Sequence, residues 1–147
     1  MASKRRQSFI EQLRRNAVAL ISLAIAITSL GYNTWRNERS EANRTQRAVS
    51  MEVLMKLGEL QRIVWHHHFD QDFEGRGNLR DGWTIAIVIR DISTVLDDPV
   101  PATAQALFDT WENVSEDLDM SDNAERAIYQ SIGAVRRDTL ALLGRLD

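Results

Sequence analysis

The sequence predicts an all-α protein, in which a single N-terminal transmembrane helix continues into a stalk and is followed by an antiparallel bundle of about four helices. Three observations predict this class. Residues 16–35 form a run of twenty residues without a charged side chain. No glycine or proline interrupts residues 32–57, so one helix can continue beyond that run. From residue 49 to the end, apolar residues recur at spacings of three and four, the period of amphipathic helices.

The composition limits the classes of function. With 147 residues, 44% of them hydrophobic and 27% charged, the chain has room for one anchor and one globular unit, which excludes a large multidomain enzyme. The absence of cysteine excludes a disulfide framework, a thiolate nucleophile and a cysteine zinc site. Residues 1–47 hold nine Lys and Arg against three Asp and Glu, whereas residues 48–147 hold nine against eighteen. The chain is therefore basic at its start and acidic in its bundle.

The first two segments are a basic N-terminal segment at residues 1–15 and the transmembrane helix at residues 16–35. At about 1.5 Å per residue, twenty residues cross the hydrocarbon core of about 30 Å. Tyr32 and Trp35 fall where interfacial aromatic residues lie. Four arginines border the run and are expected at the lipid headgroups: Arg14, Arg15, Arg36 and Arg39.

Two other interpretations of the apolar run remain open. A cleaved signal peptide also has a basic start and an apolar run, and Ala24 and Ala26 offer small residues for cleavage. A buried helix of a soluble protein is the other interpretation. For a membrane helix, five basic residues before the span and four after it favour a cytoplasmic N-terminus and an extracytoplasmic bundle. They are Lys4, Arg5, Arg6, Arg14 and Arg15 before the span, and Arg36, Arg39, Arg44 and Arg47 after it.

Small and weakly polar residues recur at helical spacing within the span, at Ser22, Ala26, Ser29 and Asn33. Such a stripe lets two membrane helices approach closely, so it predicts helix packing in the bilayer. The alternative is that small residues are merely common in membrane helices. The charged helical stalk follows at residues 36–48, with its arginines on one side and Glu38 and Glu41 on the other.

Residues 49–147 are predicted to form the bundle. The first helix places Val49, Val53, Leu57, Leu60 and Val64 on its apolar face and ends near Phe69. The second runs from Trp83 to a stop at Asp98–Pro99, and the third begins near Pro101 and continues to Leu118. Asp122 and Glu125 resemble the cap of the fourth helix. Three tryptophans are expected to be core anchors: Trp65, Trp83 and Trp111.

Residues 70–81 have the outline of an EF-hand calcium loop, with acids at positions 1, 3, 5 and 12 and Gly75 at position 6. The candidate metal ligands are Asp70, Asp72, Glu74 and Asp81, with the carbonyl of Arg76. Against this, position 12 is Asp instead of the bidentate Glu, and Arg76 and Arg80 add positive charge. A polar connection with solvated acids is the alternative.

Three consecutive histidines, His66, His67 and His68, cannot converge on one ion, because neighbouring helix residues point about 100° apart. His66 with Asp70, and His68 with Asp72, are four residues apart and would pair across a turn if the helix extends that far. The alternative is imidazoles that bond carbonyls at the end of a helix.

No constellation in the sequence predicts catalysis, and the protein is expected not to be an enzyme. No phosphate-binding glycine loop and no nucleophile motif occur. Acids are predicted along one side of the third bundle helix, at Asp109, Glu112, Glu116 and Asp119. This side either docks a basic partner or is simply solvated. Without a basic surface carrying aromatic residues, no nucleic-acid partner is expected.

Three segments, GYNTWRNERSEANRTQRA, LGELQRIV and GNLRDGW, are similar to those of a group of small bacterial membrane-anchored helical proteins with no assigned activity. The similarity runs from about Gly31 to Leu118. It implies a location in the bacterial cytoplasmic membrane, and it implies no cofactor and no site residue.

Two functions are expected from different classes. The first is a non-catalytic interaction or assembly module, with the lipid bilayer and either a second copy or another membrane protein as partners. The alternative is an extracytoplasmic bundle that senses a ligand or an ion, with calcium at residues 70–81. Only an ion-sensing bundle would be stabilised by binding an ion, so a metal-dependent rise in thermal stability separates the two candidate functions.

Overall fold

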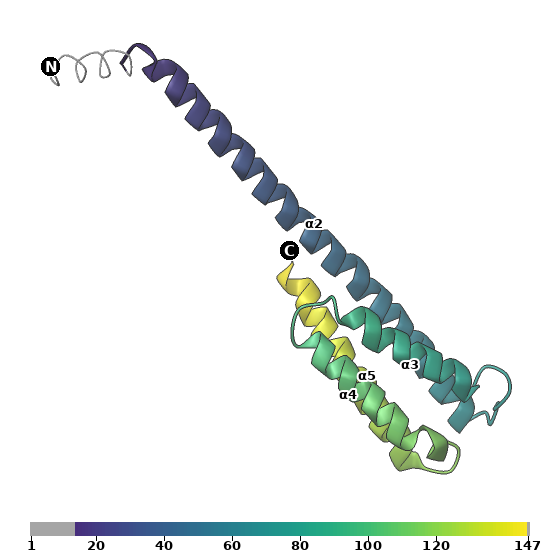
Figure 1. Ribbon diagram of the computed structural model, residues 1–147. Coiled ribbons are helices and arrows are strands. Elements are labelled where there is room, and N and C mark those ends of the chain that lie inside the picture. Colours follow the sequence, from purple (N-terminus) through teal and green to yellow (C-terminus); the bar gives the residue numbers. More distant parts are fainter. Residues whose placement is uncertain (1–13, 147) are drawn as a thin grey trace. The chain divides into compact units, whose positions relative to one another are not determined.

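The computed structural model describes residues 14–146 and is built of helices, with no strand among these residues. It divides into two compact units that meet between Ala42 and Asn43. The longest element, α2 (Ala17–His68), contributes to both units (Figure 1). The all-α class predicted from the sequence is confirmed.

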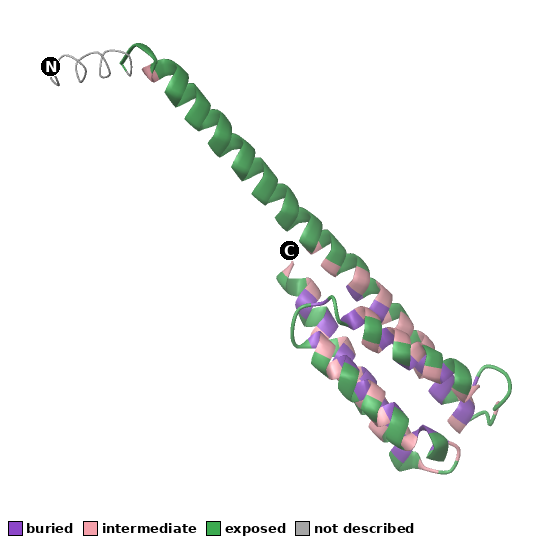
Figure 2. Ribbon diagram, viewed as in Figure 1, coloured by how far each residue is buried: buried purple, intermediate pink, exposed green. Residues whose placement is uncertain are grey.

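In the first unit, α2 is an apolar helix that stays uncovered within the part of the chain that the structure describes. Every residue from 18 to 42 is exposed, including Val18 at 77% and Leu30 at 70% of their full accessible surface (Figure 2). The hydroxyls of Thr28 and Thr34 donate to the carbonyls of Ala24 and Leu30, at 2.8 and 3.0 Å. This stretch is long and apolar enough to cross a bilayer, and the helix satisfies these hydroxyls internally, as lipid requires.

The second unit is an antiparallel helical bundle around one apolar core. It contains the rest of α2, then α3 (Leu79–Ser93), α4 (Val100–Val114), the short 3₁₀ helix η1 (Ser115–Asp117) and α5 (Asp122–Arg145). The predicted apolar face of α2 is confirmed, because Val53, Leu57, Leu60 and Val64 are fully buried. They pack with residues of the three other helices, among them Ile89, Leu107, Trp111, Ile128, Ile132, Val135 and Leu142.

Two helices begin at residues that cap them with a side chain. The Asn78 side chain accepts a hydrogen bond from the Arg80 amide at 2.9 Å and starts α3. Ser121 starts α5, since its hydroxyl accepts from the Ala124 amide at 3.2 Å. The prediction that Asp122 is the cap is therefore wrong by one residue. Asp122 is the first helical residue, where its carboxylate still interacts favourably with the positive end of the helix dipole.

The predicted bounds of α3 and α4 need correction. α3 begins at Leu79 and ends at Ser93, short of Asp98–Pro99, because the Thr94 hydroxyl and amide both turn back to the Asp91 carbonyl. The α4 segment ends at Val114, and the chain tightens into η1 before the buried Leu118. In both places the apolar periodicity continues past the end of the regular helix.

Of the three tryptophans expected in the core, the structure places one fully inside. Trp111 is completely buried, and Trp83 is partly buried against the core and the ring of Phe108. Trp65 is 52% exposed, so the prediction of a core anchor is wrong there. It lies on the opposite side of α2 from the apolar face and stacks on Phe69, with ring centroids 4.5 Å apart.

Candidate functional site

The C-terminal end of α2 carries the three histidines, and each bonds to a different part of the bundle. His66 Nδ1 lies 2.5 Å from a carboxylate oxygen of Asp70, as the four-residue spacing predicts. His67 is buried, and its Nδ1 lies 2.8 Å from the carbonyl oxygen of Gly77. Because a carbonyl only accepts, the Nδ1–H of His67 donates. The triplet therefore fastens chain segments instead of converging on one point.

His68 binds across a much longer distance in sequence than expected. Its Nδ1 donates to the carbonyl of Leu118 at 2.6 Å, and its Nε2 lies 3.4 Å from a carboxylate oxygen of Asp122. The predicted pair of His68 with Asp72 is wrong, because the imidazole faces the connection between η1 and α5. His68 thus ties that connection to the end of α2.

The loop at residues 69–78 is folded on the side chain of Asp72. Its two carboxylate oxygens accept from the amides of Gly75 and Arg76, each at 3.0 Å. Gly77 packs so closely that a Cβ atom there would lie 2.5 Å from the His67 amide nitrogen. The loop is therefore held by backbone contacts at one end and by His67 at the other.

This loop conformation does not assemble the calcium ligands suggested by the sequence pattern. Asp70 faces His66, Asp72 is engaged by backbone amides, Glu74 is exposed, and Asp81 lies in the first turn of α3. Within residues 14–146 no group of three or more His, Cys, Asp or Glu side chains could hold a metal ion. An EF-hand needs its acids turned inward, whereas two of these have other partners.

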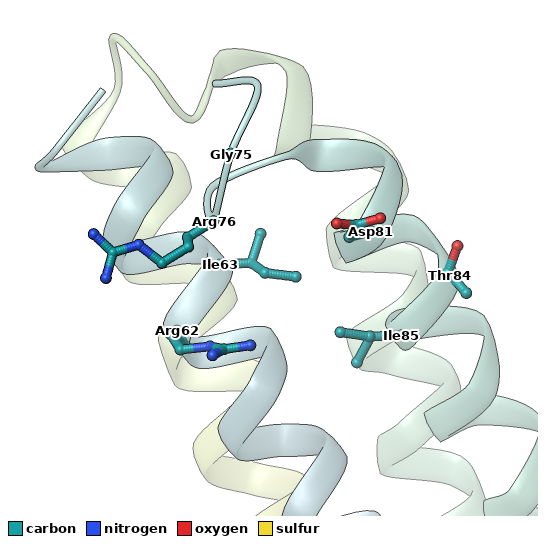
Figure 3. A pocket seen from close by; sticks show the side chains of 7 residues that line it. All are labelled: Arg62, Ile63, Gly75, Arg76, Asp81, Thr84 and Ile85. Carbon is teal, nitrogen blue, oxygen red and sulfur yellow. The ribbon is translucent and has the colours of Figure 1, made fainter. Parts of the chain in front are cut away.

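A pocket of about 500 Å³ lies beside the same loop, between α2 and α3 (Figure 3). Its lining is apolar at the base and charged at the rim, with Ile63 and Ile85, then Arg62, Arg76, Asp81 and Thr84. Figure 3 shows Ile63 and Ile85 pointing toward one another and the Arg62 side chain reaching into the gap. The Arg62 guanidinium beside the two isoleucines suits a small anion with an apolar portion. The Arg76 side chain points away from them (Figure 3), and its Nε lies 3.9 Å from a carboxylate oxygen of Asp72. Arg76 belongs to the loop whose sequence was interpreted for its acids.

The residues predicted to contact membrane lie on uncovered parts of α2 and just before it. Along one helical stripe, four residues are exposed among residues 14–146: Ser22, Ala26, Ser29 and Asn33. Arg14, Arg15, Arg36 and Arg39 are also exposed, and the Arg39 guanidinium lies 5.7 Å from the ring centroid of Trp35. Lys4, Arg5 and Arg6 lie outside the described residues.

The predicted acidic side covers more than one element. Asp109 and Glu112 are exposed on α4, Glu116 lies in η1 and Asp119 follows it. Asp119 is partly buried, and its Oδ1 has no hydrogen-bond partner among the residues described. The acids therefore extend along the side of the bundle to the end fastened by His68.

Comparison with known proteins gives no relative. No protein-family model, no curated protein and no solved structure matches this chain. The resemblance to bacterial membrane-anchored proteins therefore stays a prediction. The geometry of the described residues is therefore what supports a function for this chain.

Proposed function

We propose that the protein is a single-pass membrane-anchored helical bundle that serves as a non-catalytic interaction and assembly module. One observation carries the proposal: α2 is apolar and uncovered along its first part, while its last part supplies a full face of the bundle core. An uncovered apolar helix of this length is stable when lipid surrounds it. One helix thus serves as both anchor and structural element.

The location belongs to the same proposal. The anchor lies in a bacterial cytoplasmic membrane, with the N-terminus in the cytoplasm and the bundle outside. Arg14, Arg15, Arg36 and Arg39 contact lipid headgroups, and the Ser22, Ala26, Ser29 and Asn33 stripe packs on a second membrane helix. The acidic bundle disfavours nucleic acid and anionic lipid, so its partners are the bilayer, a second copy or another membrane protein.

The histidine end of the bundle supports a structural role over a catalytic one. The Nδ1 atoms of His67 and His68 are occupied by carbonyl groups, and that of His66 faces a carboxylate. Imidazoles held in this way join three segments of chain. Proton transfer would require a ring nitrogen aimed at a substrate position, with a second group to act on it.

Membrane fractionation with crosslinking tests the proposal on the full chain. We expect the protein to stay in the membrane pellet after alkaline extraction, and to be recovered with a second copy or a distinct membrane protein. A C-terminal reporter that is active only outside the cytoplasm is expected to be active. Recovery as a soluble monomer without partners would overturn the proposal.

The pocket beside Arg62 favours a second candidate, an extracytoplasmic bundle that senses a ligand. Its lining combines the Arg62 guanidinium with Ile63 and Ile85, so an anionic ligand with a short apolar tail suits it better than calcium. Thermal unfolding of the full chain in detergent, with calcium, inorganic phosphate or a short alkyl carboxylate, tests this candidate. Stabilisation by the carboxylate that is lost in Arg62→Gln supports it, whereas stabilisation by calcium alone supports the acidic loop.

A further inference from the structure

The outward face of α2 within the bundle carries one row of exposed residues. Between residues 49 and 69 the exposed positions are Met51, Met55, Gly58, Arg62, Trp65 and Phe69, and every other residue there is buried or half-buried. We call these six residues the α2 row. Their spacings are four, three, four, three and four, which is the spacing of a coiled-coil seam. The fold thus leaves a heptad-like face of α2 without a partner.

This row aligns four of the exposed large apolar side chains of the bundle, whereas others, such as Met120 and Leu140, lie apart from it. Met51, Met55, Trp65 and Phe69 are 52–56% exposed, and the Trp65 and Phe69 rings stack on each other. The outer side of α4 instead carries Gln105, Asp109, Glu112 and Asn113. Single exposed apolar residues are ordinary on a soluble surface, whereas an aligned row of them marks an interaction surface.

Gly58, at the centre of the row, points independently to a close partner. A glycine inside a helix destabilises it by about 0.5–1 kcal/mol relative to alanine. At Gly58 a Cβ atom would meet nothing within 4 Å, so no contact inside the bundle requires glycine. A bare backbone in the middle of an exposed helix face lets a second helix approach closely, as small residues do at helix crossings.

We propose that the α2 row is the seam along which a second copy of this chain docks in parallel and in register. The inference rests on the proposed function, because a shared membrane anchor is what holds two copies in the same orientation. A row with alternating three- and four-residue spacing is complementary to itself about a two-fold axis. Met51 and Met55 of one copy then meet the same residues of the other copy, and the two helices approach most closely where Gly58 meets Gly58.

The charges beside the row fit this register. Among residues 14–146 Arg62 has no hydrogen-bond or ion-pair partner, whereas Glu52 and Glu59 both act on the Lys56 ammonium. Glu59 flanks the row one turn before Arg62 and is 41% exposed while paired with Lys56 at 2.9 Å. Helical side chains lean toward the N-terminus, so Arg62 of one copy leans toward the Glu59 layer of the other. In register, the two Arg62 residues share one layer, and the Glu59 carboxylates one turn before it lie next to this pair of cations.

The size of the row explains why membrane confinement matters. From Met51 to Phe69 the row covers eighteen residue steps, about 27 Å of helix at 1.5 Å per residue. A stable soluble complex buries roughly 800 Å² per partner over about 20–30 residues, whereas the row has six. Two copies tethered to one bilayer need less, because confinement raises the effective concentration of each for the other.

Single-cysteine crosslinking in native membranes tests the inference on the full chain, which has no cysteine of its own. Met51→Cys and Met55→Cys place one thiol on the row, and Ala106→Cys and Ala141→Cys place one on exposed positions of α4 and α5. With a mild oxidant we expect disulfide dimers at both row positions and roughly tenfold less at the two controls.

Two glycine variants separate association from folding. Gly58→Ala is expected to raise the melting temperature slightly, yet to weaken crosslinking at Met55→Cys by roughly tenfold in association constant. Gly133→Ala is the matched control, because its new Cβ also meets nothing within 4 Å and it lies on α5, away from the row. It is expected to raise the melting temperature without changing the crosslink.

The outcomes distinguish this inference from the proposed function. If no dimer forms through the row cysteines, but the chain is still recovered with a second copy or another membrane protein, docking along the row is refuted. The proposed function as an assembly module is then retained. A row cysteine that crosslinks only to a different protein also overturns the parallel pair. A chain that is soluble and monomeric removes the proposed function itself.

Discussion

Gly82 on α3 faces the buried indole of Trp111, and replacing it with alanine tests the packing of the core. An added Cβ would lie 2.3 Å from Cζ2 and 2.5 Å from Cη2 of Trp111, far inside van der Waals contact. Trp111 is fully buried and its ring is rigid, so it cannot move aside freely. Overpacking of this kind costs about 1–3 kcal/mol, and the better helix propensity of alanine returns about 1 kcal/mol.

A Cβ atom 2.3 Å from a rigid buried ring places the overpacking cost in the upper part of that range, about 2–3 kcal/mol, so the expected net loss for Gly82→Ala is about 1–2 kcal/mol in the free energy of unfolding. For a bundle of this size that lowers the melting temperature by roughly 5–10 °C, measured by circular dichroism on the full chain in detergent. Gly133→Ala, where the new Cβ meets nothing, is expected to change stability in the opposite direction. Trp111→Phe removes the two crowded atoms and itself destabilises the core. In that background, Gly82→Ala should lower the free energy of unfolding little further. Equal melting temperatures for Gly82→Ala and Gly133→Ala would refute this account of the core.

Three further substitutions test the ends of the helices and the pH response. His67→Ala removes the donor to a loop carbonyl and is expected to cost about 1–3 kcal/mol and to expose residues 69–78 to protease, while His67→Asn, whose amide can still donate, restores part of both. Ser121→Ala should lower the urea midpoint by the equivalent of about 1 kcal/mol, more than Asp122→Ala, because only Ser121 caps α5. Burial, and then the Glu125 carboxylate, raise the pKa of Tyr129 above its ordinary value of 10.0, so the folded state holds that proton more tightly than the unfolded state. The contribution of the Tyr129 proton to the free energy of unfolding is complete below pH 10.0 and is lost as the pH rises through the higher pKa of the folded state. In urea titrations at alkaline pH, Tyr129→Phe should therefore lose less stability than the natural chain.

Periodicity predicted the parts of the fold that depend on one helix face. The three- and four-residue spacing identified Val53, Leu57, Leu60 and Val64, because a residue's place on a helix follows from sequence distance alone. The same periodicity could not place the ends of the helices. Hydrogen bonds by Thr94 decide the end of α3, and such bonds compete with the helix over one or two residues.

The candidate site was predictable only where its contacts are local. The pair of His66 with Asp70 follows from four-residue spacing on one helix turn. The bond of His68 to Leu118 joins residues fifty positions apart, so it depends on how the helices pack. At residues 70–81 the spacing of the acids could not show that backbone amides occupy the carboxylate of Asp72 in this loop conformation.

The two faces of α2 in the bundle make folding and assembly separable. Val53, Leu57 and Leu60 on one face are fully buried, and truncating any of them would cost about 2–5 kcal/mol. Substitutions of half-exposed residues on the other face, such as Met51, usually change stability by less than about 0.5 kcal/mol. The apolar character of the α2 row is therefore not needed to hold the bundle together. Loss of association at unchanged melting temperature is the signature expected of the row, and loss of both together is the signature expected of the core.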